Sequence, residues 1–157
     1  MSFPTKIYGK PLLPRNKLFV KIGPMSDPKT ILIADDDEND VFLLKRLLRK
    51  AGEFRLHIVQ NGADAIHYLA GEGEFADRER FPAPRGVILD LKLPNRDGLE
   101  VLEWMQSQSA CAGIPALVCS GLESSSHAER ARKLGAFSFS SKPPDPTQLN
   151  ALLAAMS

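Results

Sequence analysis

The segment "ILIADDDEND", residues 31–40, places four apolar residues directly before three consecutive aspartates. The apolar run predicts a buried strand, because short apolar runs bounded by polar residues are typical of strands in covered sheets. Asp37 is a good N-cap for a following helix, and Asp40 lies in the first turn, where the helix dipole stabilises an acid. Neither role accounts for Asp35 and Asp36, which come at the carboxyl end of the strand.

Short apolar runs alternate with amphipathic helical patterns along the rest of the chain, from Thr30 onward. In the first helical pattern, Val41, Leu44 and Leu48 share one face, and Gly52 provides a stop. Five strand–helix pairs are expected, with strands at 31–34, 55–59, 86–91, 115–120 and 137–141 and helices at 41–52, 62–73, 97–107, 125–136 and 145–156. The nearly continuous apolar strands favour an α/β fold, a five-stranded doubly wound parallel sheet with helices on both faces.

The composition of the 157-residue chain, with 43% hydrophobic and 25% charged residues, predicts one domain with its own core. Cys111 and Cys119 have no second cluster of Cys or His nearby, so we expect reduced packing residues, and neither a zinc site nor a disulfide. No apolar run approaches the roughly 18 residues of a membrane span, and the N-terminus lacks a signal-peptide core. We therefore expect a cytoplasmic protein without a membrane partner.

The first 29 residues differ in character from the rest of the chain. Residues 1–29 carry six Lys and Arg side chains and one acid, and they contain several prolines. A basic arm that binds nucleic acid is one interpretation. Six charges are a weak signal for nucleic acid, so we favour a leader or a short exposed hairpin, with Met25 as an alternative start. The expected domains are a basic N-terminal extension at 1–29 and a globular domain at 30–157.

Another acid, Asp90, ends a second apolar strand in "VILD". The ligand crevice of a doubly wound sheet lies at the carboxyl ends of its strands, so Asp35, Asp36 and Asp90 are expected to share it. Two carboxylates about 5 Å apart repel by roughly 3 kcal/mol at an effective dielectric of about 20. This repulsion predicts a bound cation. We expect Mg²⁺, which prefers a few carboxylates plus water and leaves room for a phosphoryl oxygen.

Two further polar residues, Ser120 and Lys142, come at the ends of the fourth and fifth apolar runs. A serine hydroxyl can hydrogen-bond a phosphoryl oxygen, and a lysine provides a counter-charge. Each residue alone is a weak signal. Together with the three aspartates they provide the nucleophile, the metal ligands, the hydrogen bond and the counter-charge of in-line phosphoryl transfer.

Residues 30–157 resemble the receiver domains of two-component response regulators over essentially their whole length. The matching motifs are "ILIADDDEND", "VILDLKLPNRDG", "LVCSG" and "SSKP". The long "GEGEFADRERFPAPRG" connection before the third strand is most similar to the small single-domain response regulators associated with phytochromes. The resemblance implies a flavodoxin-like receiver fold with the strand order 2-1-3-4-5.

The resemblance also implies a phosphoryl acceptor and a set of metal ligands. Asp90 is then the phosphoacceptor, and a sensor histidine kinase, for which a phytochrome-type kinase is one candidate, is the phosphodonor. Asp35, Asp36 and Asp90 are implied to hold Mg²⁺, with the backbone carbonyl of Lys92 as a further ligand.

The remaining implied roles concern how the phosphoryl group is held and read. Ser120 and Lys142 are implied to contact it. Ser120 and Phe139 then form the switch, in which the hydroxyl moves toward the phosphoryl group and the ring rotates into the vacated space. Phe139 stands where the family often has Tyr, so we expect the readout to depend on packing.

Phosphorylation is expected to change the surface of the helix at 125–136, the fifth strand and the last helix, and to strengthen a homodimer there. The last helix carries more apolar residues than one buried stripe needs: Leu149, Leu152, Leu153 and Met156. The alternative is that all of them belong to the core. Because the chain ends at Ser157, directly after this helix, we expect a single-domain regulator without an output domain.

One enzyme class remains as an alternative. The residues "DDDEN" also satisfy the Asp-x-Asp opening of the haloacid-dehalogenase-like phosphatases, with Asp35 as nucleophile and Asp37 as acid/base. Ser120 and Lys142 would have similar roles there, but Asp90 and "LPNRDG" would have none. We therefore favour a phosphoacceptor signalling protein that catalyses only its own phosphoryl transfer and dephosphorylation.

Overall fold

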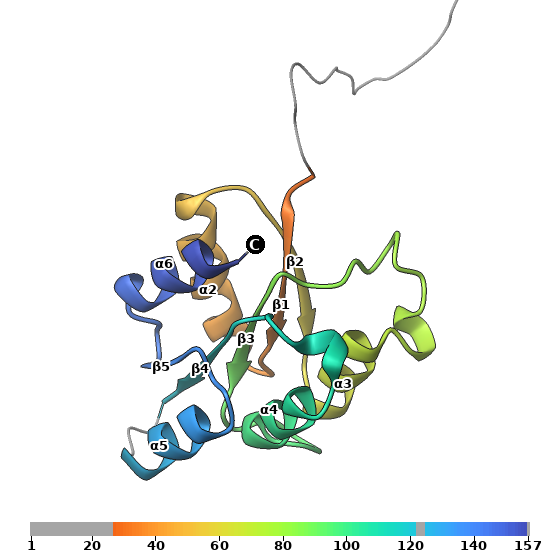
Figure 1. The fold of residues 1–157 in the computed structure, drawn as a ribbon. Coiled ribbons are helices and arrows are strands. Elements are labelled where there is room, and N and C mark those ends of the chain that lie inside the picture. The colour runs from red at the N-terminus through yellow and green to blue at the C-terminus, as the bar shows by residue number, and fades with distance from the viewer. Residues whose placement is uncertain (1–26, 122–124, 157) are drawn as a thin grey trace, which may run out of the picture.

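The computed structural model describes residues 27–121 and 125–156, which form one five-stranded sheet flanked by helices (Figure 1). The strand order is β2-β1-β3-β4-β5, and every neighbouring pair is parallel. The strands are β1 (Lys29–Ala34), β2 (Phe54–Val59), β3 (Gly86–Asp90), β4 (Ala116–Ser120) and β5 (Ser138–Ser141). The expected fold class and strand order are confirmed. The leader predicted at 1–29 lies outside the described residues except for its last three, and Lys29 begins β1.

Five α-helices follow the strands in the described part of the chain. They are α2 (Glu38–Ala51), α3 (Gly62–Ala70), α4 (Gly98–Gln106), α5 (Ser125–Lys133) and α6 (Pro146–Ala155), with short 3₁₀ helices η1 (Gly73–Phe75) and η2 (Ser109–Cys111). Helices α2 and α6 cover one face of the sheet, and α3, α4 and α5 cover the other (Figure 1). No helix among these residues is long and apolar enough to cross a membrane.

Each face of the sheet carries its own apolar core. Ile33 and Ile88 pack on the α2 and α6 side, whereas Leu89 and Val118 pack on the α3, α4 and α5 side. Both faces are covered, which explains why β1, β3 and β4 are nearly continuous apolar runs. A fully buried aliphatic side chain contributes about 1.5–3 kcal/mol, so the two cores fix the ends of the central strands firmly in place.

Helix α2 begins at Glu38, directly after the predicted N-cap Asp37 and three residues before Val41, where the expected helical pattern starts. The Asp37 carboxylate accepts hydrogen bonds from the backbone N–H groups of Asn39 and Asp40, at 2.8 and 3.1 Å. The N-cap prediction for Asp37 is therefore confirmed. Such a cap is worth about 1 kcal/mol, and it fixes the direction in which α2 leaves the end of β1.

The helix expected at 62–73 ends three residues earlier, at Ala70. Gly71 adopts a left-handed backbone, with φ 69°, and donates its N–H to the carbonyls of His67 and Tyr68. A glycine in this conformation ends a helix, because the left-handed region carries no penalty for a residue without Cβ.

The long connection after α3 packs against that helix through an aromatic cluster. The ring centroids of Tyr68, Phe75 and Phe81 lie 5.1–6.0 Å apart, within the range of favourable aromatic pairs. The Tyr68 hydroxyl donates a hydrogen bond to the carbonyl of Pro82 at 2.9 Å. The connection therefore packs onto the core that lies between the sheet and α3, α4 and α5.

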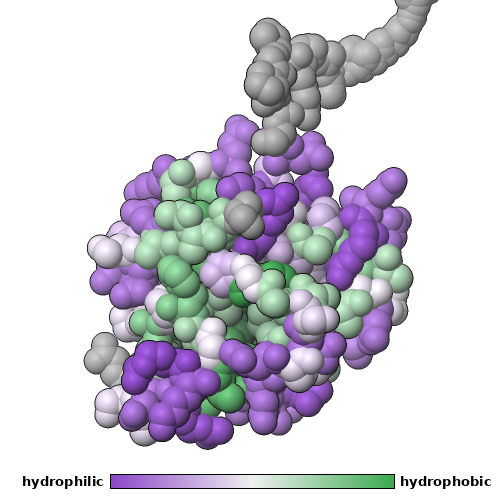
Figure 2. Space-filling model, in the orientation of Figure 1, coloured by the Kyte–Doolittle hydropathy of each residue, from purple (hydrophilic) through white to green (hydrophobic). Residues whose placement is uncertain are grey.

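The apolar residues of the last helix are mostly core. Leu149, Leu152 and Met156 are 2%, 0% and 4% exposed, and Leu153 is partly buried against the same cluster. The alternative that these residues are core is confirmed for the first three, because α6 packs directly on β4 and β5. Figure 2 shows hydrophilic side chains over α5 and apolar ones nearer the middle of that view. Phe137, just before β5, is 44% exposed.

The two cysteines are free and buried, as expected. Burial raises the pKa of the Cys119 thiol to about 12, and it also raises the pKa of Cys111. Both thiols therefore stay protonated near neutral pH, as packing residues do.

Gly98 allows α4 to start directly against the end of β3. Its N–H donates a hydrogen bond to the carbonyl of Leu91 at 2.9 Å. A Cβ at this position would lie 2.5 Å from the carbonyl oxygen of Asp90, closer than real Cβ contacts allow. The missing side chain therefore permits the tight turn that holds Asp90.

Gly98→Ala is expected to lower the free energy of unfolding by about 1–3 kcal/mol, because the backbone at Asp90 must move to admit the methyl group. Urea unfolding measures this change. Gly121→Ala is the control, since a Cβ at that position would meet no atom within 4 Å. Equal stabilities for the two variants would contradict the close approach at Gly98.

Candidate functional site

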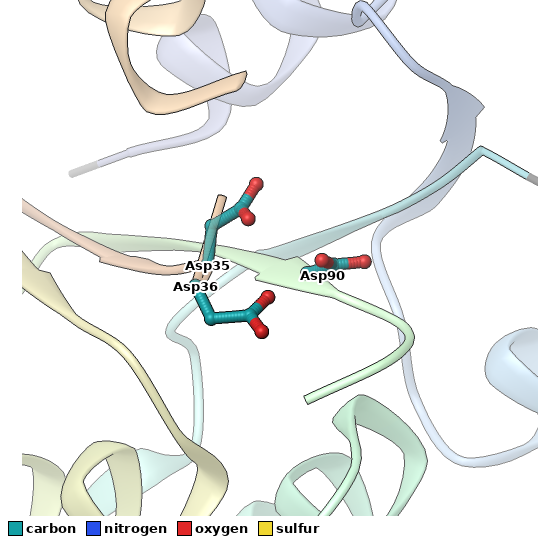
Figure 3. A group of neighbouring side chains, drawn as sticks. All are labelled: Asp35, Asp36 and Asp90. Atoms are coloured by element: carbon teal, nitrogen blue, oxygen red, sulfur yellow. The ribbon is translucent and has the colours of Figure 1, made fainter. Parts of the chain in front are cut away.

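Three carboxylates lie together at the carboxyl edge of the sheet. Asp35 and Asp36 directly follow β1, and Asp90 is the last residue of β3. One oxygen from each of the three lies within 4.8 Å of the others, and Figure 3 shows Asp35 and Asp36 at the end of β1 beside Asp90 at the end of β3. Asp35 and Asp90 are 6% and 8% exposed, whereas Asp36 is exposed to solvent. The three acids therefore lie close together, as expected from their positions at the ends of the strands.

Backbone groups support these carboxylates only in part. The N–H of Asp37 donates to Asp35 Oδ1 at 2.9 Å, and the N–H of Lys92 donates to Asp90 Oδ1 at 3.2 Å. Burial raises the pKa of Asp35, and this effect outweighs the lowering by the Asp37 N–H and by Lys142. Two buried carboxylates at about 5 Å still repel by roughly 3 kcal/mol at a dielectric of about 20. The donor set, three hard carboxylates of which one is exposed, fits a divalent cation that keeps several water ligands.

Lys142 is the cation that balances this cluster within the described residues. Its Nζ donates to Asp35 Oδ2 at 3.0 Å, to Asp40 Oδ2 at 2.8 Å and to Asp90 Oδ2 at 2.8 Å. The side chain is 14% exposed. Burial alone would lower the pKa of Lys142, but hydrogen bonds to Asp40, Asp90 and Asp35 outweigh it and raise the pKa above its ordinary value. Lys142 is therefore fully charged at neutral pH.

Asp40 is the site residue that sequence reasoning missed. At the level of the sequence, the helix dipole alone accounts for an acid at Asp40. In the structure, the Asp40 carboxylate also forms an ion pair with Lys142. A signal for this contact existed. Asp40, Leu44 and Leu48 stand four residues apart, and residues at that spacing share one helix face. Both leucines are buried, so the stripe points Asp40 toward the sheet.

Ser120 and Phe139 lie on the opposite side of the sheet edge from Lys142. Ser120 ends β4 and is 2% exposed. Phe139 pairs in register with Val118 and packs, partly buried, against the core under α3, α4 and α5. Because Val118 and Ser120 are two residues apart on one strand, Phe139 is a diagonal neighbour of Ser120 on that face. The two residues expected to form a switch are thus close in the sheet.

A small cavity of about 20 Å³ lies beside the charged groups, on the side of α2 and α6. It is lined by apolar residues of the sheet, of α2 and of the segment after Lys142, together with Asp35, Asp40, Asp90 and Lys142. This volume is enough for about one water molecule.

The arrangement of carboxylates, lysine and serine at the strand ends agrees with comparisons to known proteins. Residues 31–154 match the family model of the response regulator receiver domain. The chain belongs to this family.

Response regulators are also the relatives that the chain resembles in sequence and structure. Response regulator Rcp1 of Synechocystis sp. is 34% identical over 92 residues, which span 58% of this chain and 60% of Rcp1, less than two thirds of its length. The Mn²⁺-bound crystal structure of Rcp1 matches with a TM-score of 0.68 at 27% identity, covering 82% of this chain and 89% of that chain. The phosphorylated cyanobacterial phytochrome response regulator RcpA also matches with a TM-score of 0.68 at 27% identity, covering 83% and 90%.

The phosphatase alternative gains no support from these findings. The family and the relatives are response regulators. In addition, the Asp37 carboxylate caps α2 through the N–H groups of Asn39 and Asp40, whereas the alternative needs it as an acid/base. These findings show a receiver domain, which is a signalling protein, with an acidic cluster suited to a divalent metal.

Asp36→Asn is expected to weaken Mg²⁺ binding about tenfold or more, because the substitution removes one of only a few charged ligands. Without metal the melting temperature should stay the same or rise slightly, because repulsion among the carboxylates is relieved. Isothermal titration calorimetry and thermal unfolding measure the two effects. Glu53→Gln, an exposed acid next to the start of β2, is the control. Unchanged affinity in Asp36→Asn would exclude this carboxylate as a ligand.

Proposed function

We propose that the chain is a phosphorylation-controlled signalling protein in which Asp90 accepts a phosphoryl group in a Mg²⁺-dependent reaction. One observation carries this proposal. The Asp90 carboxylate, at the end of a central strand, lies 2.8 Å from Lys142 and within 4.8 Å of two other carboxylates that can hold a metal. A nucleophile, a metal site and a fixed counter-charge are what phosphoryl transfer needs.

In the proposed reaction, a bond forms between a carboxylate oxygen of Asp90 and phosphorus as the bond from phosphorus to the imidazole nitrogen of a phosphohistidine breaks. Lys142 balances the negative charge that gathers at Asp90, and the Ser120 hydroxyl donates to a phosphoryl oxygen. Asp35, Asp36, Asp90 and the backbone carbonyl of Lys92 would hold Mg²⁺. When bound, Mg²⁺ supplies positive charge and oxygen coordination for the phosphoryl group.

The signal is read, in our proposal, through Ser120 and Phe139. Movement of the buried hydroxyl toward the phosphoryl group leaves space on the face that Phe139 shares. The ring already packs against the core under α3, α4 and α5, so a rotation inward changes the surface formed by α5, β5 and α6. The exposed Phe137 lies at the start of this surface, which supports its use in association.

The partners we propose are a sensor histidine kinase and a second copy of this chain. A kinase of phytochrome type is supported by one of the structures that the chain resembles, which is that of a phytochrome response regulator. The division into a leader at 1–29 and a receiver domain at 30–157 and the cytoplasmic location stay predictions.

Mg²⁺ and a small phosphodonor are expected to produce an acyl phosphate on Asp90, and Asp90→Asn should abolish it, because the amide is not a nucleophile under these conditions. Borohydride trapping followed by mass spectrometry locates the label. Asp77→Asn, in the connection after α3, is the control and should be labelled normally. Label on Asp35 would contradict the proposal and revive the phosphatase.

Phe139→Ala is expected to bind beryllofluoride, a phosphoryl mimic, but to lose the change in self-association that the parent protein shows, because the ring couples Ser120 to the α5 and β5 surface. Sedimentation velocity with and without Mg²⁺ and beryllofluoride measures the association. Phe42→Ala, which removes an exposed ring on α2, should respond as the parent does. A parent protein whose association ignores beryllofluoride would refute the homodimer.

A further inference from the structure

Lys142 has no hydrogen-bonding capacity left in this structure. A lysine ammonium carries three N–H donors, and three carboxylates accept from Nζ: Asp35 at 3.0 Å, Asp40 at 2.8 Å and Asp90 at 2.8 Å. A phosphoryl group on Asp90 needs one of these donors. Phosphorylation consumes the carboxylate charge of Asp90 itself, so the phosphoryl group takes over the donor that Asp90 held and shares the ammonium with Asp35 and Asp40.

Asp40 differs from the other two carboxylates in this set. It does not belong to the group that can hold a metal, which consists of Asp35, Asp36 and Asp90. Its side chain is 33% exposed and comes from helix α2, whereas the other two come from strand ends. Metal binding and phosphoryl transfer thus assign Asp40 no role, yet its contact with Lys142 is one of the two shortest in the site.

We infer that Asp40 is a positioning residue that competes with the phosphoryl group for Lys142 and so weakens the hold of the site on that group. The inference rests on the proposed function. A negative charge 2.8 Å from Nζ cancels much of the attraction that Lys142 exerts on a phosphoryl anion. The Lys142 side chain is 14% exposed and the Asp40 side chain 33% exposed, so solvent screens this pair only in part.

The inference predicts effects of opposite sign on two ligands. Removing the charge of Asp40 makes the site less negative, so Mg²⁺ should bind more weakly. The same change leaves Lys142 free to attract an anion, so beryllofluoride should bind more tightly at saturating Mg²⁺. Simple damage to the fold would weaken both ligands, so the pair of signs separates a positioning role from a structural one.

The test compares Asp40→Asn with the full-length parent protein by isothermal titration calorimetry. We expect beryllofluoride affinity to rise roughly threefold to tenfold and Mg²⁺ affinity to fall about twofold to fivefold, as screened charges several ångströms apart would give. The substitution preserves the size of the side chain. It also preserves the cap of α2, because Asp40 takes part in the cap through its backbone N–H.

Two further variants make the result decisive. Asp40→Glu keeps the charge and should keep both affinities near the parent values. Glu38→Gln removes the same charge from an exposed position in the same turn of α2 and should change beryllofluoride affinity by less than twofold, as expected for an exposed charge. If Asp40→Asn weakens both ligands, or behaves as Glu38→Gln does, the inference is overturned. A parent protein that binds neither ligand would refute the proposed function itself.

Discussion

The structure depends on a charge imbalance at the carboxyl edge of the sheet, where four carboxylates face one lysine. Asp35, Asp40 and Asp90 share the ammonium of Lys142, and Asp36 adds a fourth negative charge beside them. Burying Asp35 and Asp90 in such a cluster is costly, because one cation cannot offset four anions. Two backbone N–H groups offset a further part of the cost. The remaining negative charge suits the site to a divalent metal.

The rest of the fold keeps these groups from moving apart. β1 and β3 are neighbours in the sheet, and Ala34 pairs in register with Leu89, so the next residues, Asp35 and Asp90, continue the same row. The N-cap at Asp37 fixes the start of α2, and Gly98 lets α4 close tightly behind Asp90. Repulsion alone would spread the carboxylates, but the two apolar cores hold the strand ends that carry them.

The fold and the principal site could be predicted because their signals are local. Apolar runs indicate the strands, and a polar residue that directly follows a run must lie at the carboxyl edge. Asp40 was harder to assign, since the helix dipole explained it sufficiently and the partner, Lys142, is 102 residues away. The burial of Leu149 and Leu152 depends on how α6 packs across β4 and β5, and the packing of Tyr68 on Phe81 depends on a connection without periodic pattern. Local patterns do not contain such long-range contacts.

The site lies between two layers that contact it differently. Lys142 and Asp40 line a cavity on the α2 and α6 side, whereas Phe139, next to Ser120 in the sheet, packs into the core on the α3, α4 and α5 side. In the proposed function, Lys142 and Asp40 act on the phosphoryl group by charge, over the few ångströms around Nζ. Phe139 acts by packing, which transmits a change in shape through close-packed neighbours. Because the layers are separated by the sheet, we expect that different residues alter the strength of phosphoryl binding and its readout, and that a substitution in α2 need not disturb the surface of α5.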